Sequence, residues 1–176
     1  MRNISESSLA DALAHWGHHE ASGRLKNNVE CDSSDRLVCL NLVLQCRTPY
    51  VARIIAREPL STHLVAFEPQ DAVSFVLADG RSIEDWIART TAAGDEACAY
   101  FRRMVEDPAV ATGRIVCAAD FANHDARQLG TIVLYDGWHR AAAWVERNRT
   151  GNPSVLEAYL IIVRHPDPLL LPPVSR

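Results

Sequence analysis

Residues 136–140 place an acid, a glycine, a tryptophan, a histidine and an arginine in direct succession, within the segment GTIVLYDGWHRAAAWVERNR. The apolar run before them predicts a β-strand, and the Ala-rich segment after them predicts a helix that begins at this turn. The first amides of a helix lack intrahelical partners, and the helix dipole favours negative charge there. Arg140 adds a planar fork of donors that suits phosphate. The sequence therefore predicts an anion site for a nucleotide phosphate.

Four residues offer further chemistry. His139 is a candidate general acid or base, because an imidazole titrates near neutral pH. Trp138 offers a ring on which a nucleobase can stack. Metal-assisted hydrolysis needs carboxylates beside a bound water. Asp136 and Glu68, which each end an apolar run, are therefore the candidate ligands for Mg²⁺.

The composition limits the class of protein. The chain has 176 residues, of which 48% are hydrophobic, and this fits one globular domain. No apolar run approaches the ~20 residues of a membrane span. The first residues lack the order of a secretory signal, and the five cysteines contain no C-x-x-C pair, so we expect a cytoplasmic protein. A net charge of −4 argues against binding nucleic acid through overall basicity.

Hydrophobic periodicity and turn signals predict an α+β fold with a mixed sheet. Ser82 is the predicted N-cap of a helix, with Asp85 at the third position after it, and Gly94 ends that helix. The predicted helices cover residues 5–22, 50–58, 82–93, 95–107 and 139–149. The predicted strands cover residues 36–45, 62–68, 72–80, 113–121, 131–137 and 155–163.

The predicted organisation has three parts: a helical extension over residues 1–28, a domain over 29–165 and a Pro-rich tail over 166–176. The tail carries four of the nine prolines, and we expect it to lie across the surface or to bind a partner. In the extension, His15 and His19 stand four residues apart, a spacing at which two histidines can share a metal ion. Because no third ligand is visible nearby, an ordinary polar helix face is the better interpretation.

The closing strand–strand–helix–strand unit, over about residues 113–163, resembles the ParB/sulfiredoxin superfamily. The run YDGWHRAAAW stands in the order of the sulfiredoxin turn GGCHR and the Ala-rich helix that follows it. Asn152-Pro153 and the run VLEAYLIIV stand where those proteins have a break and a last strand. The resemblance implies the ParB/sulfiredoxin-like fold, with the D-G-x-H-R turn between a strand and a helix.

The resemblance gives each residue of the turn a role. Gly137 would let the chain approach a phosphate closely, and His139 and Arg140 would face the nucleotide phosphates. Asp136 would hold a metal ion or orient a nucleophile. Trp138 stands in place of the sulfiredoxin catalytic cysteine, which excludes sulfinic-acid repair by the family's route.

A stand-alone module of this kind is expected to bind ATP or another NTP together with Mg²⁺, since the chain ends too soon for the helix-turn-helix of the partition proteins. It is similar to the plasmid-encoded oncogenic-suppression type, fertility inhibitors that act on conjugative DNA transfer as ATPase and DNase. We therefore expect an ATP hydrolase with metal-dependent DNase activity, whose partners are a nucleotide, DNA and a protein of the DNA-transfer machinery. Two other hypotheses stay open: a non-catalytic binding module switched by nucleotide, and a small-molecule kinase similar to the free-amino-acid kinases.

Overall fold

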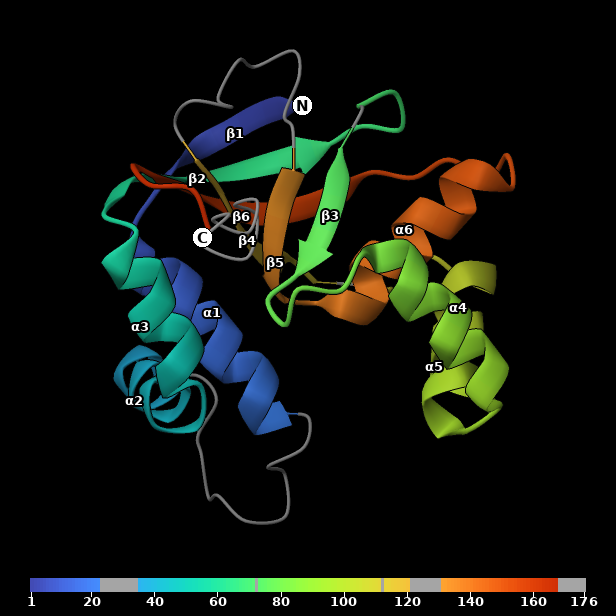
Figure 1. Cartoon of the computed structure of the whole chain (residues 1–176), viewed down its shortest axis with the longest axis horizontal. Coiled ribbons are helices and arrows are strands. Elements are labelled where there is room, and N and C mark those ends of the chain that lie inside the picture. Colours follow the sequence, from blue (N-terminus) through green and yellow to red (C-terminus); the bar gives the residue numbers. More distant parts are fainter. Residues whose placement is uncertain (23–34, 72, 112, 121–130, 168–176) are drawn as a thin grey trace, which may run out of the picture.

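A six-stranded β-sheet runs through the protein in the order β1-β2-β6-β4-β5-β3 (Figure 1). This computed structural model describes residues 1–22, 35–71, 73–111, 113–120 and 131–167. The strands are β1 (Arg2–Ser7), β2 (Pro59–Phe67), β3 (Ser74–Leu77), β4 (Ile115–Asp120), β5 (Thr131–Asp136) and β6 (Leu156–Val163). The helices are α1 (Leu9–Ser22), α2 (Arg36–Cys46), α3 (Thr48–Ala56), α4 (Ile83–Ala93), α5 (Glu96–Glu106) and α6 (Trp138–Arg149). The β3–β5 and β4–β6 pairs are parallel and the other pairs antiparallel, so the predicted α+β class with a mixed sheet is confirmed.

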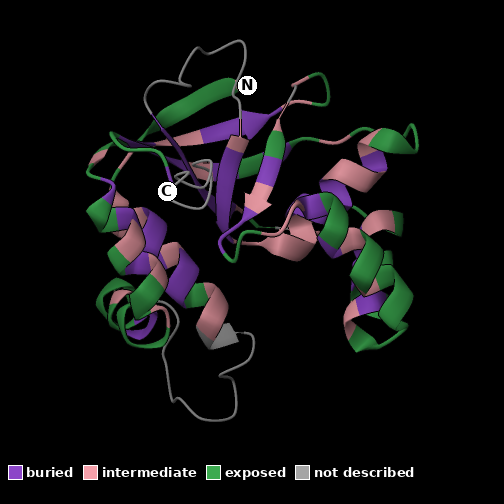
Figure 2. Cartoon of the chain, viewed as in Figure 1, coloured by how far each residue is buried: buried purple, intermediate pink, exposed green. Residues whose placement is uncertain are grey.

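Helices cover both faces of this sheet, because successive side chains of the inner strands point to opposite sides. In β4, Ile115 and Cys117 belong to one core, whereas Val116 and Ala118 belong to the other. The first core is closed by α4, α5 and α6, and the second by α1, α2 and α3. Figure 2 shows β5 buried between these layers and β1 exposed at the edge. The sheet is therefore apolar on both sides along its inner strands.

Strand β6 lies in the middle of the sheet, although it is the last strand in the described part of the chain. It pairs antiparallel with β2, where Leu156 faces Phe67, and parallel with β4, where Ala158 faces Ile115. β6 thus joins the β1–β2 pair to the β4–β5–β3 group.

Most of the predicted elements lie within a few residues of their expected positions. These are α3, α4, α5 and α6 among the helices and β2 to β6 among the strands. The Ser82 side chain accepts a hydrogen bond from the amide of Asp85 at 3.0 Å, as the capping pattern predicts. Gly94 follows α4 in the left-handed region, at φ 64°.

The prediction of a helix from residue 5 was wrong at its start. Residues 2–7 form β1, and α1 begins only at Leu9. The helix begins there because Ser8 and Asp11 cap it reciprocally: the Ser8 amide donates to the Asp11 carboxylate at 3.2 Å, and the Asp11 amide donates to the Ser8 hydroxyl at 3.1 Å. The first residues therefore contribute an edge strand as well as a helix.

The prediction of a strand over residues 36–45 was also wrong, because this run forms α2. The carboxylate of Asp35 accepts hydrogen bonds from the amides of Leu37 and Val38 and so caps the helix. The run is apolar on its exposed side as well as its buried side. Leu37 is 70% and Leu44 is 40% exposed. A continuous apolar run carries no period that separates a strand from a helix.

The segment after β6 is held through Asp167, so this residue of the predicted surface tail is buried. Its carboxylate accepts a hydrogen bond from Nε of Arg53 at 2.8 Å and pairs with Arg57 at 3.4 Å. The hydroxyl of Tyr135 lies 3.3 Å from the same carboxylate.

Residues 168–176 and the predicted boundary at residue 28 lie outside the described residues. Among the described helices, none is long and apolar enough to cross a bilayer.

Gly17→Ala is expected to lower the free energy of unfolding by about 2–3 kcal/mol. A Cβ at Gly17 of α1 would lie 1.8 Å from the carbonyl oxygen of Cys39 on α2, so the two helices would have to separate. Urea denaturation followed by circular dichroism measures the change. Gly94→Ala is the matched control: its Cβ meets nothing within 4 Å, so only the left-handed backbone cost of about 1 kcal/mol remains. Equal losses in the two variants would contradict this account of the α1–α2 contact.

Candidate functional site

The C-terminal end of β5 opens into a cavity of about 440 Å³ between the two helical layers. From one side, α1 contributes Trp16, His19 and Glu20, and from the other side the predicted turn contributes residues 136–140. Figure 1 shows the end of β5 next to the start of α6, between the two groups of helices. Cavities of this size, at the carboxyl end of strands, accept small molecules in many proteins.

Asp136 connects the two layers at this cavity. Its Oδ2 atom lies 2.6 Å from Nδ1 of His19 and 3.1 Å from Nη2 of Arg140. All three side chains are largely buried, with 15%, 18% and 13% of their surface exposed. The sequence pointed to Asp136 and Arg140. It did not show that His19 is their partner, because 117 residues separate His19 from Asp136.

The position of the proton on His19 follows from these contacts. An ionised carboxylate only accepts hydrogen bonds, so Nδ1 of His19 must carry a proton to lie 2.6 Å from Oδ2 of Asp136. Nη2 of Arg140 is 3.0 Å from the same Nδ1. Because both nitrogens are donors, they converge on one carboxylate oxygen rather than bonding to each other. In neutral His19 the lone pair therefore resides on Nε2.

The carboxylate of Asp136 is held in its charged form. Burial raises its pKa, but the hydrogen bond from His19 and the positive charge of Arg140 more than offset burial, and the pKa lies below its ordinary value. Asp136 is therefore ionised at neutral pH and holds the side chains of His19 and Arg140 in place.

Gly137 makes room for the side chain of Arg140. Its φ is 83°, and a Cβ there would lie 2.5 Å from Cγ2 of Ile115 and 2.9 Å from Nη2 of Arg140. We expected this glycine to let a phosphate approach the backbone. In the structure the guanidinium of Arg140 occupies the space beside it, so the glycine is needed for the Arg140–Asp136 pair.

The start of α6 presents donors that lack acceptors. Its N-cap is Gly137, which provides no side-chain cap, whereas side chains cap α2, α4 and α5. Nε of Arg140 and Nε1 of Trp138 are buried and have no hydrogen-bond partner in the described part of the chain. A buried donor left unsatisfied costs about 1–3 kcal/mol. A ligand rich in acceptor oxygens would recover that cost.

The remaining predicted residues of the turn pack among aromatic side chains. The ring of His139 lies edge-on to Trp86 of α4, with centroids 4.9 Å apart, and to Tyr100 of α5 at 5.4 Å. The guanidinium of Arg81 lies over the ring of Trp138 at 5.7 Å. These side chains form the wall of the cavity on the α4–α6 side.

The opposite wall contains residues that the sequence did not reveal. Arg47 donates to both carboxylate oxygens of Glu20, at 2.7 and 2.9 Å. The indole of Trp16 donates to the same carboxylate at 3.1 Å. Arg47 directly precedes α3 and Glu20 lies near the end of α1, so only the fold brings them together. The bidentate ion pair between Arg47 and Glu20 holds this wall in a fixed shape.

Glu68 is not part of this site. It follows β2, and β6 and β4 lie between β2 and β5, so at least three strand spacings, about 14 Å, separate Glu68 from Asp136. Its carboxylate lies 3.4 Å from Nε of Arg2 instead. No group of three or more metal-ligating side chains gathers anywhere in the described residues. The structure therefore does not bring the two predicted Mg²⁺ ligands together.

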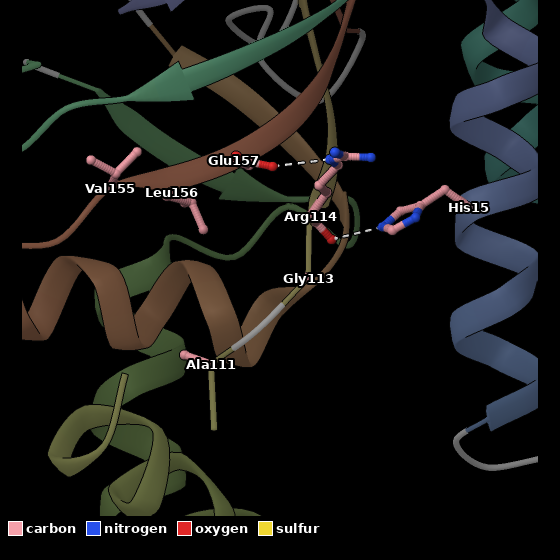
Figure 3. A pocket seen from close by; sticks show the side chains of 7 residues that line it. All are labelled: His15, Ala111, Gly113, Arg114, Val155, Leu156 and Glu157. Atoms are coloured by element: carbon pink, nitrogen blue, oxygen red, sulfur yellow. Dashed lines mark hydrogen bonds and ion pairs between the residues drawn. The ribbon is translucent and has the colours of Figure 1, made fainter. Parts of the chain in front are cut away.

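A second cavity, of about 380 Å³, lies beside His15 of α1 (Figure 3). Nε2 of His15 is 3.3 Å from the carbonyl oxygen of Arg114, and Arg114 in turn pairs with Glu157. The His15 ring meets His19 edge-on, with centroids 4.2 Å apart. His15 and His19 therefore do lie on one face of α1, where each binds a different partner.

Comparisons with protein-family models, with curated proteins and with solved structures found no match to this chain. The site is therefore interpreted from its own geometry.

The stability of the protein is expected to fall faster on acidification than that of a His15→Gln variant. Burial and, next, the neighbouring His19 lower the pKa of His15 to about 4. An unfolded histidine takes up its proton near pH 6.5, so between pH 6.5 and 4 protons favour the unfolded state. Glutamine can keep the hydrogen bond to Arg114 but does not titrate.

Urea midpoints at pH 7.5 and pH 5 measure this effect. We expect the parent to lose about 1–2 kcal/mol more than His15→Gln over this interval, after allowance for the partial exposure of the ring. Identical losses would show that His15 is not held neutral by its surroundings.

Proposed function

We propose that the cavity at the end of β5 binds a nucleoside triphosphate, ATP in the first place, and that the protein hydrolyses it. The observation that carries this proposal is the cluster of donors at the start of α6. The buried Nε of Arg140 and Nε1 of Trp138 have no acceptor among the described residues, and the helix start has no side-chain cap. A phosphate group supplies several acceptor oxygens and negative charge, which this cluster and the helix dipole both favour.

The rest of the cavity is consistent with a nucleotide. Three arginines and two carboxylates line it, and Arg81, the arginine without a carboxylate in the lining, pairs with Asp79. These charged residues are Arg47, Arg81, Arg140, Glu20 and Asp136. The rings of Trp86, Tyr100 and Trp138 line the same cavity and offer apolar surface for a base.

Magnesium fits this proposal as an ion that arrives with the phosphates. Mg²⁺ is usually bound by one or two carboxylates and by substrate oxygens, so it does not require a cage of protein ligands. Asp136 and Glu20 are the carboxylates that line the cavity. When bound, the ion would neutralise charge on the phosphates.

The DNase activity and the role in conjugative DNA transfer belong to this proposal only through the resemblance to the ParB/sulfiredoxin superfamily. The switch module and the small-molecule kinase remain the rival hypotheses. Turnover separates them: a hydrolase releases phosphate to water, a kinase moves it to an added acceptor, and a switch binds without turnover.

Arg140→Ala is expected to weaken ATP binding by about 10- to 100-fold, because a charge-assisted hydrogen-bond partner of the phosphate is lost. Calorimetry with the non-hydrolysable analogue AMP-PNP and Mg²⁺ measures binding. Release of phosphate from ATP and CTP measures turnover, and nicking of supercoiled plasmid tests for DNase activity. A thermal melt confirms that the variant is folded, since Asp136 loses one of its partners.

Arg149→Ala is the matched control, because Arg149 lies on the same helix but is exposed and pairs with Glu84 outside the cavity. We expect it to bind and turn over nucleotide like the parent. A folded Arg140→Ala protein that binds and hydrolyses ATP as well as this control would refute the proposed phosphate site.

A further inference from the structure

Three arginines line the cavity at the end of β5, and each forms an ion pair with a nearby carboxylate. The pairs are Arg47–Glu20, Arg81–Asp79 and Arg140–Asp136. Within these pairs the charges balance. A phosphate that enters the cavity therefore competes with a carboxylate of the protein for whichever arginine binds it.

Two of the three pairs use two nitrogens of the guanidinium. Nε and Nη2 of Arg47 donate to separate oxygens of Glu20, at 2.7 and 2.9 Å. Arg81 also donates through Nε and Nη2, with its Nε 2.8 Å from Asp79. Two such bonds hold an arginine more firmly than one. These two pairs are therefore the harder ones to open.

The third pair is more weakly bonded. In the described part of the chain, Arg140 donates to Asp136 through Nη2 at 3.1 Å, and its Nε is buried with no acceptor. A Cβ at Gly137 would lie 2.9 Å from Nη2 and 3.1 Å from Nε, so this edge of the guanidinium lies against the chain at the start of α6. A buried nitrogen meets a ligand only when the guanidinium turns.

We propose that Asp136 competes with phosphate for Arg140, and that the Arg140–Asp136 pair opens when the nucleotide binds. This inference rests on the proposed function and names the contact that controls the affinity of the same site. When the guanidinium turns, Nε gains the acceptor that it lacks, and the hydrogen bond from Nη2 passes from Asp136 to the phosphate. Asp136 keeps His19 as a partner, since Nδ1 of His19 lies 2.6 Å from Oδ2, so the carboxylate is not left unpaired.

The competition lowers the affinity of the parent and selects its ligands by charge. Arg140 and Asp136 are both largely buried, so solvent screens their attraction only in part. A ligand has to offset the loss of that attraction, and only the remainder appears as binding affinity. A polyphosphate brings more charge to Arg140 than a monoanion does. The closed pair therefore discriminates against weakly charged ligands.

Asp136→Asn removes the competing charge but keeps an oxygen that can accept hydrogen bonds from Arg140 and His19. Binding of AMP-PNP is measured by calorimetry in EDTA, so that loss of a metal contact at Asp136 has no effect on the result. We expect the Kd of the variant to be about 10-fold lower than that of the parent. A thermal melt shows whether the variant is folded. A folded variant that binds no more tightly than the parent would overturn the competition.

Asp79→Asn is the matched control, because it removes the same charge from the neighbouring pair with Arg81. We expect its Kd for AMP-PNP to stay within about twofold of that of the parent, since both partners of this pair are about one-third exposed and are screened by water. Equal gains in Asp79→Asn and Asp136→Asn would show that only the overall charge near the cavity matters, and would refute the opening of one particular pair.

A measurement on the parent itself does not depend on the folding of Asp136→Asn. The Nε–H signal of Arg140, identified in nitrogen-15 NMR by its loss in Arg140→Ala, should shift when AMP-PNP is added, whereas that of Arg47 should stay in place. An Arg140 signal that does not move in a parent that binds AMP-PNP would overturn this inference and leave the nucleotide site standing. A parent that binds no AMP-PNP with or without Mg²⁺ would refute the proposed function and this inference together.

Discussion

The carboxylate of Asp136 is the point at which the two helical layers of this protein meet. α1 lies on one face of the sheet and α6 on the other, and a single oxygen of Asp136 accepts hydrogen bonds from both, through His19 and Arg140. Asp136 is the last residue of β5, and this position places its carboxylate at the C-terminal end of the strand, where α1 and α6 can both reach it. The contact also requires glycine at position 137, because the folded-back guanidinium of Arg140 leaves no room for a Cβ.

The charges of Asp136 and Arg140 are energetically costly to bury. A carboxylate with little exposure is tolerated because two donors compensate it, and removal of either would leave charge uncompensated in a poorly solvated place. The two donors offset the cost of burying the Asp136 carboxylate, but the buried Nε of Arg140 has no acceptor among the described residues. The same three side chains therefore join the two helical layers and also line the cavity.

The parts of the structure that sequence could predict are those determined by neighbouring residues. The β5–α6 turn, the Ser82 cap and the stop at Gly94 each depend on a few adjacent residues, and each lies where it was expected. The two errors also had local signals. Asp35 before the apolar run and the Ser8–Asp11 pair mark the true helix starts, but a run that is apolar on all sides and a polar edge strand both lack a diagnostic period.

The sequence revealed only the residues on one side of the candidate site, and the reason here is different. Asp136, Trp138 and Arg140 are close in sequence, so their grouping could be predicted. His19, Glu20 and Arg47 reach the cavity because α1 and α3 pack on the far face of the sheet, and no local pattern encodes that packing. Glu68 shows the converse: a carboxylate at a strand end was a reasonable ligand until the strand order placed β6 and β4 in between.

The central position of β6 has a consequence for how the protein is made. During synthesis, β2 and β4 emerge long before β6 (Leu156–Val163), which lies between them in the sheet. Until β6 is made, the amides and carbonyls along one edge of β2 and one edge of β4 have no strand to pair with. Assembly of the sheet therefore waits for contacts between segments far apart in the chain, which makes folding slow. Until then the unfinished chain exposes unpaired strand edges, the part of a sheet that is most prone to pair with neighbouring chains.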